Sequence, residues 1–141
     1  MLRTDAGKRE GVALVCRARY SLGVADPQIS RGDVFWVNDG VSQHLHPHVV
    51  VQDDVFNHSR IETVVVCALT TNLNRANEPG NVMLDVDEAK LPKQSVVVVS
   101  QISSILKASL GERIGSLSPA RVEQVLAGLR FQQASFFNGH R

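Results

Sequence analysis

Between Ile29 and Thr70 the chain contains three β-rich runs that are separated only by polar loops. The runs are Val34–Val37, Val49–Gln52 and Thr63–Leu69. The last two are nearly unbroken series of apolar residues, which is typical of strands that are covered on both faces. Short strands that follow one another without an intervening helix favour antiparallel pairing.

Further β-rich runs follow towards the C-terminus. Strands are predicted at Val82–Val86 and Ser95–Val99, after a loop at 72–81 that contains the turn-forming pair Pro79-Gly80. Residues 101–117 allow two interpretations. The apolar residues at 102, 105 and 106 have helical spacing, whereas ERIGSL fits a short sixth strand better.

The C-terminal helix has the clearest signals in the chain. Ser118 is a favourable N-cap, and Pro119 suits the first helical position. Apolar residues then recur with the period of an amphipathic helix, at Val122, Val125, Leu126 and Leu129. Short consecutive strands followed by one helix predict a mainly β (α+β) fold, a small and mostly antiparallel barrel with a docked helix.

Composition and charge exclude several classes of protein. The 141 residues fit one domain, and no apolar run approaches the ~20 residues that span a bilayer. The short apolar piece GVALVC is followed by Arg17 and Arg19, so we expect no secretory signal and no membrane association. Cys16 and Cys67 make neither a disulfide framework nor a metal cluster, which suits the reducing cytoplasm. The net charge of +1 indicates that any nucleic-acid site is a local groove.

In this order, the strands and helix resemble the MazF/PemK family of toxins from bacterial toxin–antitoxin pairs. The matching pieces are IxRGDVFWV (Ile29–Val37), HPHVVVQDDVFN (His46–Asn57), VVVCALT (Val64–Thr70), LPKQSVVVVSQI (Leu91–Ile102) and GERIGSLSPARVEQVLAGL (Gly111–Leu129). They predict an N-terminal extension at 1–28, a barrel domain at 29–132 and a tail at 133–141.

The resemblance implies an SH3-like β-barrel of the MazF/PemK/CcdB type with a C-terminal helix. It also implies a homodimer that cleaves single-stranded RNA in a sequence-specific, metal-independent reaction, with no cofactor. The expected partner is a small antitoxin whose disordered tail occupies the RNA groove.

His46 and Thr70 are the candidate catalytic residues. His46 stands where the family usually carries an arginine, and an imidazole can exchange protons near neutral pH, which a guanidinium hardly does. Thr70 matches the family threonine that contacts the scissile phosphate. The alternative interpretations are a surface histidine of a weakened toxin and a β-branched residue that simply ends a strand.

Other residues of the groove are predicted around these two. His44, Asn72, Asn74 and Arg75 could contact RNA, with Arg75 on a phosphate, although asparagine is also common in turns. Gln101 matches a family position at the end of the fifth strand. A non-enzymatic toxin or binding module on the same fold, such as a gyrase poison, remains the alternative function.

A metal site formed by His44, His46 and His48 is disfavoured. The three would share a face of a regular strand, but Pro47 is expected to interrupt it, and no acidic or cysteine ligand lies near. Cys67, within VVVCAL, is predicted to be a buried apolar residue.

Overall fold

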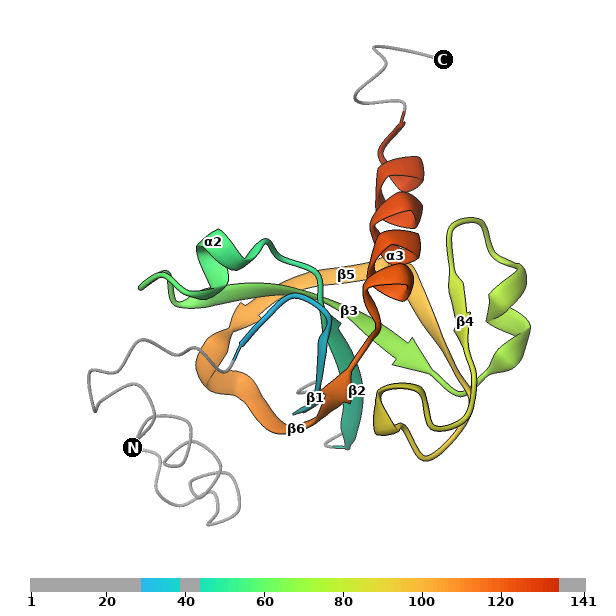
Figure 1. The fold of residues 1–141 in the computed structure, drawn as a ribbon, viewed down its shortest axis with the longest axis horizontal. Coiled ribbons are helices and arrows are strands. Elements are labelled where there is room, and N and C mark those ends of the chain that lie inside the picture. The colour runs from blue at the N-terminus through green and yellow to red at the C-terminus, as the bar shows by residue number, and fades with distance from the viewer. Residues whose placement is uncertain (1–28, 39–43, 135–141) are drawn as a thin grey trace.

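A curved antiparallel sheet forms the body of the protein (Figure 1). The structure is a computed structural model that describes residues 29–38 and 44–134. The strands of this part are β1 (Asp33–Asn38), β2 (Leu45–Val50), β3 (Thr63–Thr70), β4 (Val82–Leu84), β5 (Ser95–Leu106) and β6 (Leu110–Ser116). They pair in the order β4-β5-β3-β2-β1-β6, and every pairing is antiparallel. The helices are α2 (Asp54–Asn57), α3 (Pro119–Gln132) and the 3-10 turns η1 (Leu73–Asn77), η2 (Glu88–Lys90) and η3 (Lys107–Ser109).

Strand β3 separates two apolar clusters, as its sequence predicts. Val64 and Val66 belong to one cluster, together with Phe35 of β1. Cys67 and Leu69 belong to the other cluster, which reaches the helix α3. Because side chains alternate along a strand, an unbroken apolar run supplies both faces of the sheet. Cys67 is fully buried, which confirms it as a core residue, and burial raises the pKa of its thiol to about 12.

The predicted barrel is confirmed, with one difference: the hydrogen-bonded order ends at β4 and β6, so the sheet itself does not close. The turn η2 packs against β6 instead. A Cβ atom on Gly115 of β6 would collide with the carbonyl oxygen of Ala89, which explains why glycine stands there. The predicted barrel is therefore an open one, with η2 beside its β6 edge.

Several predicted strand boundaries are wrong. Strand β2 runs from Leu45 to Val50 rather than from Val49 to Gln52. It contains Pro47, which is tolerated because the β3 ladder begins only at His48. Strand β4 ends at Leu84. Strand β5 continues to Leu106, so the residues with helical spacing at 102–106 belong to a strand.

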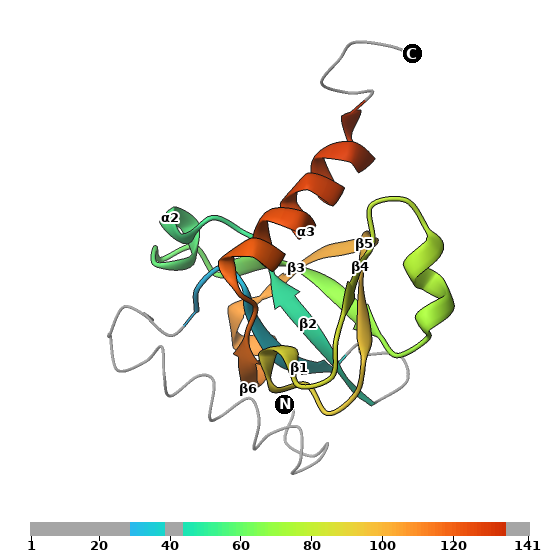
Figure 2. The same ribbon diagram turned by 45° about the vertical axis from the view of Figure 1, so that its right-hand side comes forward.

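The C-terminal helix is confirmed, including its cap. The Ser118 hydroxyl accepts a hydrogen bond from the amide of Arg121 at 3.2 Å, and Pro119 is the first helical residue. Figures 1 and 2 show α3 lying across the bend of β5, with the β4 hairpin beside it. Within residues 29–38 and 44–134, no helix is long and apolar enough to cross a membrane.

The sequence reasoning missed the short helix α2. Its N-cap is Asp53, whose side chain accepts from the amide of Val55, and the fully buried Asn57 closes it. Beneath this corner the buried Lys107 donates to the carbonyl oxygens of Phe56, Asn57 and Ser59 at 3.3, 2.9 and 3.1 Å. The lysine thereby satisfies acceptors at the end of the helix.

Candidate functional site

The candidate catalytic residues lie at the same end of neighbouring strands. Strand β2 starts at Leu45, next to His46, and β3 ends at Thr70. The β2–β3 ladder runs from Val50–Val66 to His48–Ala68 and stops there. Continued for two more residues, this register would align His46 with Thr70 on one face of the sheet. His46 also pairs with Val37 of β1 and is exposed.

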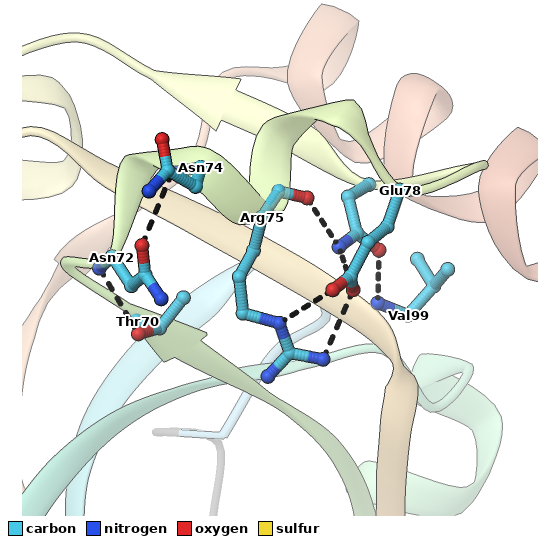
Figure 3. Close-up of polar contacts among 7 residues, drawn as sticks. Thr70, Asn72, Asn74, Arg75, Glu78 and Val99 are labelled. Carbon is cyan, nitrogen blue, oxygen red and sulfur yellow. Dashed lines mark hydrogen bonds and ion pairs between the residues drawn. The ribbon is translucent and has the colours of Figure 1, made fainter.

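The Thr70 side chain is held by the turn that follows it. Its Oγ1 atom accepts a hydrogen bond from the amide of Asn72 at 3.1 Å (Figure 3). This bond uses a lone pair of the oxygen and not its proton, so the hydroxyl keeps the capacity to donate. On the other side Thr70 pairs with Val96 of β5, which fixes its backbone.

The turn η1 brings the predicted polar residues together. Asn72 is its N-cap, and the Asn72 side chain accepts from the amide of Asn74 at 3.2 Å. The amide of Arg75 then donates to the carbonyl oxygen of Asn72 at 3.1 Å. These local bonds connect Thr70 to Arg75 through consecutive turns of backbone; Figure 3 shows those that join Thr70, Asn72 and Asn74.

The guanidinium of Arg75 forms a two-point ion pair with Glu78. Nε lies 2.9 Å from Oε2, and Nη2 lies 2.9 Å from Oε1. The hydrogen bond to Glu78 raises the pKa of Arg75, and the hydrogen bond from Arg75 lowers the pKa of Glu78. Asn81 completes the group, because its amide nitrogen donates to Glu78 Oε1 and its oxygen accepts from the amide of Val99 (Figure 3).

The histidines lie along the beginning of β2. His44 precedes the strand and is exposed, as is His46, and His48 is confirmed as a strand residue. The Nδ1 atom of His48 lies 3.1 Å from the carbonyl oxygen of His46, so that nitrogen must carry the proton in this contact. Among the residues that the structure describes, no three His, Cys, Asp or Glu side chains are grouped to hold a metal ion.

Gln101 lies in the middle of β5 and not at its end as predicted, because the strand is longer. Its segment faces the register shift of the β3–β5 ladder between Cys67 and Leu69. The side chain is exposed. Phe35 is a core residue, and Trp36 beside it is half-buried.

Sequence reasoning did not identify Glu78 and Asn81 as partners of Arg75. One local signal was present, since Glu78 follows Arg75 by three residues in a turn. The hydrogen bond from the Val99 amide to the Asn81 side chain joins residues 18 positions apart, and no local pattern predicts it.

Comparisons with known proteins agree on one family. A family model described as PemK-like, MazF-like toxin of type II toxin–antitoxin system matches residues 30–132. Endoribonuclease MazF2 of Mycobacterium bovis is 35% identical over 107 residues, which cover 72% of this chain and 94% of that protein. Endoribonuclease MazF6 of Mycobacterium tuberculosis gives the same values.

Solved structures show the same fold. An endoribonuclease in complex with its cognate antitoxin, from a mycobacterial species, superposes with a TM-score of 0.65 at 24% identity, covering 75% of this chain and 95% of that one. A MazE–MazF structure from Deinococcus radiodurans gives a TM-score of 0.59 at 18% identity, covering 74% and 93%.

Proposed function

The chain belongs to the PemK-like, MazF-like toxins of type II toxin–antitoxin systems, and from this premise we propose that it is a toxin that cleaves single-stranded RNA without a metal ion. The observation that carries the proposal is its 35% identity to proteins named endoribonucleases, over nearly their whole length. The strand ends with His46 and Thr70 fit such a reaction.

In the proposed reaction the 2′-hydroxyl of the RNA attacks the adjacent phosphorus. A protein group must take the proton of that hydroxyl, and a proton must reach the leaving 5′-oxygen. His46 is the residue proposed for proton transfer, because an imidazole can both accept and donate near neutral pH. Its exposure leaves it accessible to a substrate as large as RNA.

The proposed role of Thr70 is to donate a hydrogen bond to a non-bridging phosphate oxygen. Its hydroxyl proton is not used in the bond with Asn72, and preorganised donors stabilise charge that develops in the transition state. His44, Asn72, Asn74 and Arg75 would contact the bases and phosphates of an unstacked strand, and Gln101 would support the groove from β5.

The proposed partners follow from similar toxins. A mycobacterial endoribonuclease has been solved in complex with its cognate antitoxin, and MazF of Deinococcus radiodurans has been solved with MazE. We expect this chain to act in the cytoplasm as a homodimer, with a cognate antitoxin that blocks the RNA groove. Light scattering at micromolar concentration should give the mass of two chains, and a monomer would contradict this expectation.

The test is cleavage of a long single-stranded RNA by the purified protein in EDTA. Cleavage at defined positions is expected, and His46→Ala should slow it by about 10²- to 10⁴-fold without changing the fold. His46→Arg separates charge from proton transfer. Restored activity would mean that positive charge suffices, and loss as large as in the alanine variant would mean that proton exchange is the role.

Two matched controls protect the interpretation. His58→Ala removes an exposed histidine beyond the far end of β2, and Thr71→Val removes the hydroxyl next to Thr70. Both should cleave like the wild type, whereas Thr70→Val should be impaired. A folded wild type that never cuts RNA would refute the enzyme and favour the non-enzymatic toxin.

A further inference from the structure

The proposed function places the guanidinium of Arg75 on an RNA phosphate. In the free protein this guanidinium is paired with the carboxylate of Glu78. A carboxylate and a phosphate both accept the two parallel hydrogen bonds of a guanidinium. We propose that Glu78 is an internal stand-in for an RNA phosphate, and that RNA binding exchanges the Arg75–Glu78 pair for an Arg75–phosphodiester pair. This inference rests on the proposed function and assigns Glu78 a role in setting the strength of RNA binding.

The backbone around the pair is fixed, so that the side chain can exchange without moving the turn. The amide of Arg75 donates to the carbonyl oxygen of Asn72, and the Arg75 carbonyl accepts from the amide of Glu78 at 3.1 Å. The Asn81 side chain binds the same carbonyl oxygen at 2.9 Å. Its oxygen is in turn held by the amide of the buried Val99 at 3.0 Å. The Arg75 side chain can therefore change its partner while its backbone stays in place.

Losing the guanidinium of Arg75 costs the Glu78 carboxylate little free energy. Its Oε1 atom keeps the hydrogen bond from Asn81 at 3.1 Å after the guanidinium departs. The Glu78 side chain is 44% exposed, so water can hydrate the carboxylate, and exposed ion pairs contribute little to stability. A partly exposed pair with good two-point geometry can thus hold Arg75 ready and still release it to a phosphate.

The pair also removes the positive charge of this turn in the free protein. From Thr71 to Leu84 the charged residues are Arg75 and Glu78 alone. Attraction of a distant anion by this segment is therefore weak, and binding depends on a phosphate that reaches the guanidinium itself. Glu78 would in this way favour RNA that fits the groove over polyanions in general.

The test measures binding of a mixed-sequence 2′-O-methyl oligonucleotide, which has no free 2′-hydroxyl and cannot be cleaved. Glu78→Gln keeps an oxygen for Asn81 but loses the charge, and it should tighten binding by roughly threefold to tenfold. Arg75→Ala should weaken binding and reduce the salt dependence by about one phosphate contact. Arg75→Lys should recover only part of the loss, because an ammonium lacks the planar fork.

The double variant Arg75→Ala/Glu78→Gln distinguishes exchange of partners from simple repulsion between Glu78 and the RNA phosphates. If Arg75 and Glu78 exchange partners, Glu78→Gln should change affinity by less than about twofold when Arg75 is already alanine. The control Glu123→Gln removes an equal charge from the exposed face of α3 and should have no effect. Equal tightening in both backgrounds, or weaker binding by Glu78→Gln alone, would overturn the inference.

Cleavage of unmodified RNA by the same variants separates this inference from the proposed function. Binding that depends on Arg75 and Glu78 without any cleavage would refute the proposed reaction and leave the exchange standing. Cleavage by the wild type, together with binding that ignores both residues, would refute the exchange and leave the reaction standing.

Discussion

Replacing Lys107 should destabilise the fold markedly, because its side chain is buried. Its ammonium is buried and donates to three carbonyl oxygens of the α2 corner. Hydrogen bonds with a charged partner contribute roughly 1.5–3 kcal/mol each, but water can reach part of this corner, since Phe56 and Ser59 are exposed. We therefore expect Lys107→Met, which keeps an apolar side chain, to lower the free energy of unfolding by about 2–4 kcal/mol.

Urea unfolding measures this loss directly. With a slope of about 2 kcal/mol/M for a chain of this size, the midpoint of Lys107→Met should fall by roughly 1–2 M. Lys107→Ala should lose about 1–2 kcal/mol more, because the buried methylenes disappear as well. Lys93→Met replaces an exposed lysine and should stay within about 0.5 kcal/mol of the wild type. A Lys107→Met protein as stable as this control would refute the role of the three hydrogen bonds.

Three further changes test the packing, an ion pair and the domain boundary. Gly128→Ala should lower the thermal stability by about 1–2 kcal/mol although alanine favours helix, because its Cβ would collide with the carbonyl oxygen of Gly80; a more stable variant would contradict this. The hydrogen bond from Arg121 lowers the pKa of Glu88 below its ordinary 4.5, so this pair stabilises the fold at neutral pH and is lost as the pH falls through the lowered value. Glu88→Gln should therefore flatten the loss of stability between pH 5 and pH 3 in urea titrations, and a steeper loss would argue against the pair. Deleting residues 1–26 should leave a folded protein with its RNA activity, since the apolar clusters of the described part begin at Ile29, and an unfolded product would place the boundary elsewhere.

The strands were predictable where apolar residues cover both faces of the sheet. The helical spacing in β5 also arises because its apolar residues pack on both faces. Ile102 packs on the cluster that contains Cys67, whereas Ile105 packs on the cluster that contains Phe35. Residues three apart in a strand point to opposite faces. Two isoleucines that serve opposite faces therefore imitate the spacing of a helix, and only the tertiary structure distinguishes the two cases.

The candidate site was predictable in its location and less so in its connections. Polar residues that follow a buried strand, such as Thr70 and Asn72, mark a strand end in any sequence. The contacts that anchor the turn η1 could not be predicted from the sequence. The Asn81 side chain accepts from the amide of Val99 on β5, and Gly80 lies close to the backbone of α3 at Gly128. Close approaches of this kind depend on how the elements pack, which a local pattern does not contain.

The two proposed catalytic residues lie on different strand pairings of the sheet. Thr70 lies on a strand that pairs with β5, and the turn after it is tied to β5 through Asn81. His46 lies beyond the last rung of the β2–β3 ladder and pairs there with Val37 of β1. The residue proposed to bind phosphate is thus tied to β5, whereas the residue proposed to transfer protons lies where β2 pairs with β1. Changes in the β1–β2 pairing should therefore impair chemistry more than binding, because proton transfer tolerates less displacement than a phosphate contact does.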